Sequence, residues 1–210
     1  VDYFSLAPSA DGEFEFVRWS AAYDRTPLNE REEGTLDLPT GARAKRVTVD
    51  GAYRGERLPV YVIEPEGVKP PYQAVIWMGG INILMDRRTE HAITLMSSFL
   101  DFLRKSGRMV VMPIYGGTLE RSDGKGMLRG GPVSRRDSFF EWSKDLGRTL
   151  DYLEARGDVD MQRVGFVGLS FGAIMGQKMV SLEKRIATLI LWSGGFPASS
   201  PPEDAAAAVR

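Results

Sequence analysis

The spacing of apolar residues becomes regular near residue 45. Lys45–Asp50 alternates apolar and polar positions as a half-buried strand does, and Gly51 to Gly55 marks a turn into a second strand, Glu56–Pro65. These two strands predict an antiparallel hairpin. Residues 1–44 show no such period. Phe14, Phe16 and Trp19 could anchor a short helix or strand there, and we expect the segment as a whole to form a turn-rich N-terminal arm that precedes the folded core.

After the hairpin, short apolar runs alternate with longer segments of helical spacing. The runs are typical of strands buried on both faces: Ala74–Met78, Arg108–Pro113, Arg163–Gly168 and Ile186–Trp192. Residues 88–105, 138–156 and 171–183 carry apolar positions at helical spacing. This alternation predicts an α/β fold, with a mostly parallel, doubly wound sheet and the antiparallel hairpin at its start. We expect the core to span residues 45–197 and residues 198–210 to be a linker or tail, so that the sheet stops after the strand at 186–192.

Composition narrows the class of protein. The 210 residues are 43% hydrophobic and 26% charged with a net charge of −1, which argues against nucleic-acid binding. The chain has no cysteine, so disulfides, thiolate catalysis and zinc–thiolate sites are excluded. This leaves the compartment open, with the cytoplasm favoured. No apolar run approaches the roughly 20 residues of a membrane-spanning helix.

The segment Gly168-Leu169-Ser170-Phe171-Gly172 places one serine between two glycines, after an apolar strand and before a helix. A serine hydroxyl acts as a nucleophile only when it is aimed, deprotonated and given a stabilised position for the oxyanion. A tight strand-to-helix turn aims it, and glycines are required where the turn approaches other backbone. We therefore interpret Ser170 as a candidate nucleophile. The alternative is a serine that only caps the helix.

Backbone N–H groups near this turn are candidate oxyanion donors. Phe171 begins the helix after Ser170, and Gly79-Gly80 follows directly on the buried strand at 74–78. We expect the N–H of Phe171 to be one donor and that of Gly80, or else Ile81, to be the second. Gly79-Gly80 could also be only a turn. Tyr115, Glu120 and Arg121 leave the next strand at the same sheet edge and are candidates for lining the pocket, if they are not ordinary loop residues.

Taken together, "DMQRVGFVGLSFGA" and "AVIWMGG" resemble the α/β-hydrolase superfamily, in its dienelactone hydrolase and prolyl-oligopeptidase-like branch. "GERLPVYVIEPEGVKPPYQAVIWMGG" and "LDFLRKSGRMVVMPIYGGTLER" are similar to esterase domains that in bacteria sometimes follow a Ser/Thr protein kinase. The resemblance covers roughly residues 24–197. It implies a serine hydrolase, most simply a carboxylesterase, that cleaves small-molecule esters through an acyl-enzyme without a metal or organic cofactor. A serine peptidase of the same fold is the alternative enzyme.

The sequence departs from this superfamily in its catalytic base. The acid and the histidine should follow the nucleophile, yet 40 residues follow Ser170 and the single histidine, His91, precedes it. As the base, His91 would require the reverse chain order, with the histidine before the nucleophile. Lys178 and Lys184, the candidates for a Ser–Lys dyad, lie along or beyond the next helix and point away from the turn. Asp204 comes too early in the chain for the acid.

Two interpretations of the missing base stay open. The acid and histidine lie beyond residue 210, or the chain is a non-catalytic, hydrolase-like binding module. An uncovered sheet edge after residue 192 favours the first. The partner at that edge would then be a further C-terminal segment, or else a second copy of the chain.

Overall fold

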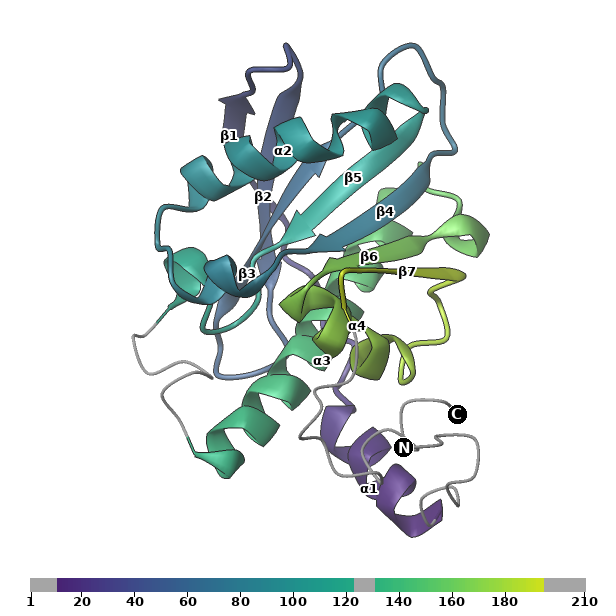
Figure 1. Cartoon of the computed structure of the whole chain (residues 1–210). Helices are drawn as coiled ribbons and strands as arrows, with labels where there is room; N and C mark the ends of the chain where they lie inside the picture. Colours follow the sequence, from purple (N-terminus) through teal and green to yellow (C-terminus); the bar gives the residue numbers. More distant parts are fainter. Residues whose placement is uncertain (1–10, 123–130, 195–210) are drawn as a thin grey trace.

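The computed structural model describes residues 11–122 and 131–194 and contains one mixed sheet of seven strands in the order β1-β2-β3-β5-β4-β6-β7 (Figure 1). The strands are β1 (Arg31–Asp37), β2 (Arg43–Asp50), β3 (Arg57–Ile63), β4 (Gln73–Met78), β5 (Arg108–Pro113), β6 (Gly165–Leu169) and β7 (Thr188–Trp192). β1, β2 and β3 pair antiparallel, and β3 joins β5 antiparallel. β5, β4, β6 and β7 are parallel. The predicted α/β class, the parallel sheet and the N-terminal hairpin are confirmed.

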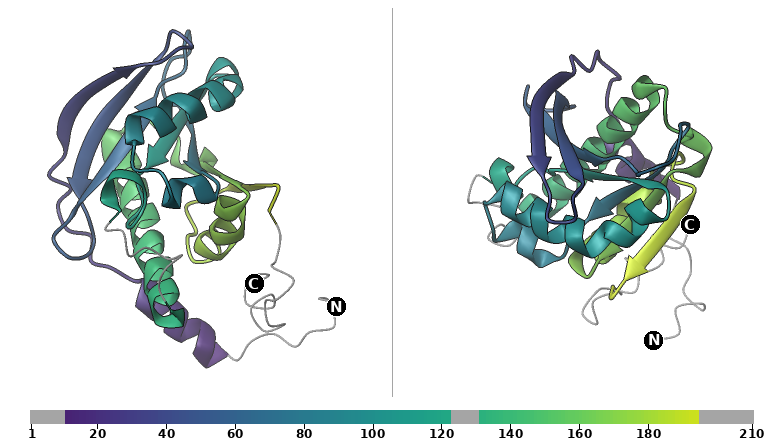
Figure 2. Two further views of the ribbon diagram at one scale, coloured as in Figure 1. Left: turned by 60° about the vertical axis from the view of Figure 1, so that its left-hand side comes forward. Right: turned by 90° about the horizontal axis from the view of Figure 1, so that it is seen from above.

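Helices cover both faces of this sheet (Figure 2). α2 (Thr89–Lys105) lies on the face to which Trp77 of β4 points, since its Phe99 ring packs 6.0 Å from the Trp77 ring. α3 (Pro132–Arg156) and α4 (Phe171–Val180) cover the opposite face, where Phe166 of β6 meets Gly176 of α4. α1 (Asp11–Ala21) packs against α3. Short 3-10 turns lie at Ile81–Leu84, Leu119–Arg121 and Met161–Arg163.

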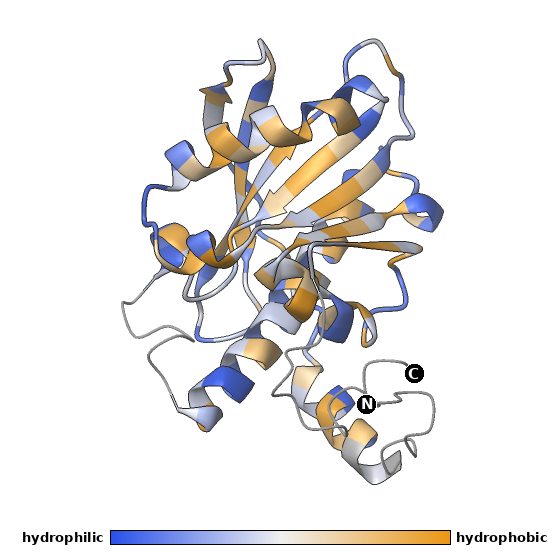
Figure 3. Cartoon of the chain, in the orientation of Figure 1, coloured by the Kyte–Doolittle hydropathy of each residue, from blue (hydrophilic) through white to orange (hydrophobic). Residues whose placement is uncertain are grey.

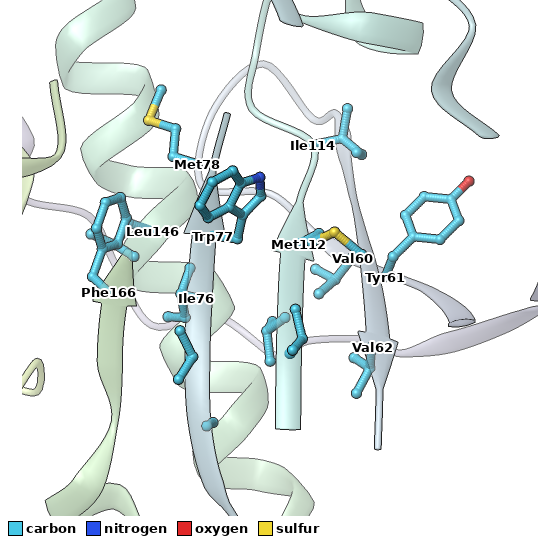
Figure 4. Close-up of a cluster of buried hydrophobic side chains, with 14 of the residues drawn as sticks. Val60, Tyr61, Val62, Ile76, Trp77, Met78, Met112, Ile114, Leu146 and Phe166 are labelled. Atoms are coloured by element: carbon cyan, nitrogen blue, oxygen red, sulfur yellow. The ribbon is translucent and has the colours of Figure 1, made fainter. Parts of the chain in front are cut away.

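The core lies around the central strands. β4 and β5 are buried at every position after their first residue, which explains their uninterrupted apolar runs. Figure 4 shows Ile76 and Trp77 of β4 between Phe166 of β6 and Met112 of β5. Figure 3 shows hydrophobic residues concentrated on these strands, whereas the helices carry both hydrophobic and hydrophilic residues. The burial of this apolar surface is the main favourable term in folding.

One strand lies in the segment expected to be an arm. β1 pairs with β2, with a register shift between Glu32 and Gly34, where Gly34 adopts a φ of 127°. Six of the seven β1 positions are exposed, so the sequence REEGTLD carries no apolar alternation. Main-chain pairing at the edge of the sheet, rather than a buried face, holds this strand in place.

Element boundaries also differ from the prediction. α3 begins at Pro132 rather than residue 138, because Gly131 is its N-cap and a proline at the first helical position has the right φ and needs no N–H acceptor. β6 begins at Gly165 because Met161–Arg163 forms a 3-10 turn after Asp160, whose carboxylate accepts the N–H of Gln162 at 3.0 Å. β7 begins at Thr188. The predicted tail, residues 198–210, lies outside the described residues.

Candidate active site

Ser170 occupies the sharp turn between β6 and α4. Its backbone has φ 51° and ψ −110°, in a positive-φ region that a non-glycine residue seldom adopts, and the residue is exposed. The main-chain N–H of Ser170 donates to the carbonyl of Trp192 in β7 at 2.7 Å, and its carbonyl accepts the N–H of Ala173 at 3.0 Å. The turn is therefore held from both sides and presents the serine at the carboxyl edge of the parallel strands.

The two glycines that flank Ser170 are required by the packing of main chain against main chain. A Cβ on Gly172 would lie 2.2 Å from the carbonyl oxygen of Met78 and 2.6 Å from that of Gly79. A Cβ on Gly168 would lie 2.3 Å from the carbonyl oxygen of Gly172. All three distances are far inside van der Waals contact, so α4 can approach the ends of β4 and β6 only with glycine at these positions.

The predicted oxyanion residues lie beside this turn. A Cβ on Gly80 would lie 3.7 Å from the Cβ of Ser170 and 3.8 Å from the carbonyl oxygen of Leu169. Phe171 is the first residue of α4, and the first N–H groups of a helix have no intrahelical acceptor. Ile81 follows Gly80 with a half-exposed side chain. The end of β4 and the start of α4 thus meet around Ser170, where helix N–H groups favour negative charge.

The three residues expected to line a pocket separate in the structure. Tyr115 is buried and lines a small internal cavity of about 30 Å³ with Trp77 and Gly79. Burial raises the pKa of the Tyr115 phenol. Glu120 is exposed and pairs with Arg46 at 3.3 Å, whereas the Arg121 side chain is only 7% exposed and lies within an ion-pair cluster.

Asp145 of α3 is the centre of that cluster, and no pattern in the sequence indicates this. Its Oδ2 accepts hydrogen bonds from Arg121 Nη1 at 2.7 Å, from the Tyr53 hydroxyl at 2.9 Å and from the Gly116 N–H at 2.9 Å. Burial disfavours the charged guanidinium of Arg121, but the neighbouring Asp145 more than offsets this and keeps the pKa of Arg121 above its ordinary value. Asp145 lies between Lys144 and Leu146 on α3, so its burial depends on which face the helix turns inward.

The Asp145 cluster is connected by packing to the serine turn. Trp142, fully buried on α3, donates its indole N–H to the carbonyl of Gly116 at 2.6 Å. The Trp142 ring meets Phe171 edge to face, with centroids 5.8 Å apart. The loop after β5 and the start of α4 therefore share one buried support.

The described residues contain no partner that could deprotonate Ser170. His91 lies in the first turn of α2 with its side chain 58% exposed, and its Nδ1 is 3.5 Å from the carboxylate of Asp86. No hydrogen bond joins His91, Lys178 or Lys184 to Ser170 within residues 11–122 and 131–194. Asp204 lies outside the described residues.

The described part of the chain holds neither a cluster of metal-ligating side chains nor a membrane-spanning helix. No group of three or more histidine, aspartate or glutamate side chains is placed to hold a metal ion there. None of the helices in the same ranges is long and apolar enough to cross a membrane.

Comparison with known proteins gives fold-level relationships. No protein-family model and no curated protein matches the sequence. Among solved structures, acetyl xylan esterase 1 from Thermoanaerobacterium sp. JW/SL YS485 superposes with a TM-score of 0.65 and 17% identity, over 89% of this chain and 59% of that one. A glucuronoyl esterase from Solibacter usitatus gives a TM-score of 0.56 and 16% identity, over 86% and 56%.

A third similar structure lies closer to the branch that the sequence resembles. A structure described as a dienelactone hydrolase, from Klebsiella pneumoniae subsp. pneumoniae MGH 78578, gives a TM-score of 0.51 and 13% identity, over 84% of this chain and 64% of that one. The chain thus spans less than two thirds of the length of each of these proteins. At these identities the likeness is one of fold, and the chain has the α/β-hydrolase fold.

Proposed function

We propose that this chain carries the nucleophile and oxyanion site of a serine carboxylesterase. The observation that carries the proposal is the exposed, positive-φ Ser170 at the β6–α4 turn, with Gly80 directly beside it. Strain of this kind persists only where the surrounding structure holds it, and such positions concentrate at functional sites. The esterase activity of structures with a similar fold supports the same chemistry.

In this mechanism the Ser170 hydroxyl attacks the carbonyl carbon of an ester while a histidine takes its proton. The N–H groups of Phe171 and Gly80, or of Ile81 in place of Gly80, hydrogen-bond to the oxyanion that forms. Collapse of the tetrahedral intermediate breaks the bond to the alcohol, which leaves with the proton from the histidine. Water then attacks the acyl-enzyme by the same route and releases the acid.

The histidine and its acidic partner would come from polypeptide that follows residue 210. Two observations support this part of the proposal. The chain spans 59% of the first acetyl xylan esterase, and β7 exposes Ile190, Leu191 and Trp192 at the edge of the sheet. An apolar edge strand of this kind pairs readily with a further strand. Without the histidine we expect a loss on the order of 10⁶ in kcat, so that residues 1–210 alone would have almost no activity.

Labelling with a fluorophosphonate probe tests the nucleophile. In a chain that includes the polypeptide after residue 210, the probe should label Ser170 and not a Ser170→Ala variant, with hydrolysis of p-nitrophenyl acetate lost in parallel. Ser98→Ala is the matched control, because Ser98 is exposed on α2 and, among the described residues, its hydroxyl bonds only to the Thr94 carbonyl. Equal labelling of the Ser170→Ala variant, or no labelling of the longer chain, would leave the binding-module interpretation.

The same preparation separates an esterase from a peptidase. An esterase should turn over short-chain esters far faster than peptide anilides that carry the same acyl group. Faster cleavage of the anilides would replace the esterase proposal with the peptidase alternative. The carbohydrate ester classes named for the similar structures are the first substrates to test.

A further inference from the structure

α1 and the start of α3 lie at the end of the molecule away from β1 (Figure 1). Residues of these two helices and of the segment after α1 line a groove that does not include Ser170. Its volume is about 550 Å³, within the range of about 300–1,000 Å³ that small-molecule sites occupy. Aromatic and polar side chains line it in similar measure: Phe16, Trp19, Ser20, Tyr23, Asp24, Arg136, Asp137, Phe140 and Lys144. None of these residues belongs to the proposed ester site.

Two aromatic rings on α1 stand out because they are not buried. Trp19 is 75% exposed and Phe16 is 54% exposed, with their ring centroids 6.3 Å apart. Burial of rings of this size is strongly favourable, so an exposed pair beside a groove marks a contact surface for a ligand or partner. The two rings form one wall of the groove.

The polar groups of the groove are available and electrically balanced. Ser20, Asp24 and Lys144 have no side-chain hydrogen bond or ion pair within the described residues. Arg136 and Asp137 pair with each other at 2.8 Å. One free carboxylate therefore accompanies one free ammonium group, and the groove offers both donors and acceptors without an excess of either charge.

We propose that this groove binds a neutral oligosaccharide, with a sugar ring packed on the exposed face of Trp19. A pyranose has an apolar C–H face that packs on an aromatic ring and hydroxyl groups that both donate and accept hydrogen bonds. A nucleotide or another phosphorylated ligand would need unpaired cationic side chains, and this groove offers one. The choice of xylose oligomers as the first probe rests on the proposed function, whereas the groove itself does not.

Isothermal titration of the 210-residue chain with xylohexaose and with cellohexaose tests the site. We expect measurable binding of at least one oligomer, and binding at least about tenfold weaker in Trp19→Ala. Phe16→Ala should weaken binding, whereas Phe102→Ala should not, because Phe102 is equally exposed, at 54%, but lies on α2. Far-UV circular dichroism and thermal midpoints equal to wild type would show that each variant is folded.

Further arms separate this proposal from the esterase proposal and test the neutrality of the ligand. Ser170→Ala should bind the oligomer as wild type does. Failure of the esterase proposal would therefore leave the groove proposal intact, and failure of the groove proposal would leave the esterase proposal intact. The dissociation constant should stay constant between 50 and 500 mM NaCl. Absence of binding to both oligomers, undiminished binding by Trp19→Ala, or tighter binding of hexagalacturonate than of the neutral oligomers would each overturn the proposal.

Discussion

Replacement of Asp145 by asparagine should destabilise the fold far more than its position on a helix suggests. The asparagine keeps the size of the side chain but removes the negative charge opposite Arg121, whose side chain is 7% exposed. Asp145 itself has no exposed side-chain surface, and its Oδ2 accepts three hydrogen bonds. Among the described residues, the variant therefore leaves the buried guanidinium with one ion-pair partner, Glu56, which is 40% exposed and 3.0 Å away.

Removal of one partner from a buried pair costs about 3–5 kcal/mol of unfolding free energy, and the remaining Glu56 places our expectation near the lower end, about 3 kcal/mol. For a domain of this length about 2–4 °C accompanies each kcal/mol, so the thermal midpoint should fall by about 6–12 °C. Urea unfolding followed by tryptophan fluorescence measures the free energy, and circular dichroism measures the midpoint.

Asp137→Asn provides the matched control on the same helix. Asp137 also pairs with an arginine, Arg136 at 2.8 Å, but its side chain is 48% exposed. Exposed pairs contribute about 0–1 kcal/mol, so this variant should unfold almost as wild type does. If Asp145→Asn costs no more than Asp137→Asn, burial does not determine the strength of the Asp145–Arg121 pair and our reasoning fails.

Three further predictions concern other contacts of the fold. Gly172→Ala should lower the free energy of unfolding in urea by about 3 kcal/mol, because the new Cβ would lie 2.2 Å from a main-chain oxygen of β4. Gly12→Ala, with nothing within 4 Å of its Cβ, should stabilise α1 slightly, and equal effects of the two variants would contradict the close approach. Tyr115→Phe should leave the free energy of unfolding unchanged or higher, because its buried hydroxyl has no partner among the described residues. Tyr53→Phe should lower it by about 1–3 kcal/mol, because that hydroxyl bonds to the Asp145–Arg121 pair, and the reverse order of the two effects would refute this reasoning. Hydrogen bonds and charge from Lys105 and Arg104 of α2 lower the pKa of Asp101 below 3.8, so its stabilising effect is present above that pH and is lost as the pH falls through the folded-state pKa. The difference in unfolding free energy between wild type and Asp101→Asn should therefore shrink between about pH 5 and pH 2, and a constant difference would exclude this linkage.

Much of the fold could be predicted because its strands are buried on both faces. A strand such as β4 or β5 must be apolar at nearly every position, and that run is visible without knowledge of its neighbours. β1 shows the opposite case. Its side chains face solvent and its position depends on main-chain pairing with β2, so its sequence carries no matching signal.

The turn at Ser170 could also be predicted, because glycine at 168 and 172 is a local requirement of a tight strand-to-helix connection. The role of Arg121 in the buried cluster could not be predicted from the sequence. The sequence placed it after a strand at the expected site edge, but its side chain turns into the Asp145 cluster. Loop position fixes where a residue leaves the sheet, and it does not fix which neighbour its side chain meets.

By itself, then, the sequence determined the order and type of the main elements and the local geometry of the serine turn, since both depend on neighbours close along the chain. Only the tertiary structure decided which polar residues are buried together, as Asp145 joins Tyr53 and Arg121 from distant segments. It also brought Gly80 beside Ser170. Such contacts depend on the packing of α3, α4 and the strand ends in three dimensions, and no period along the chain records that packing.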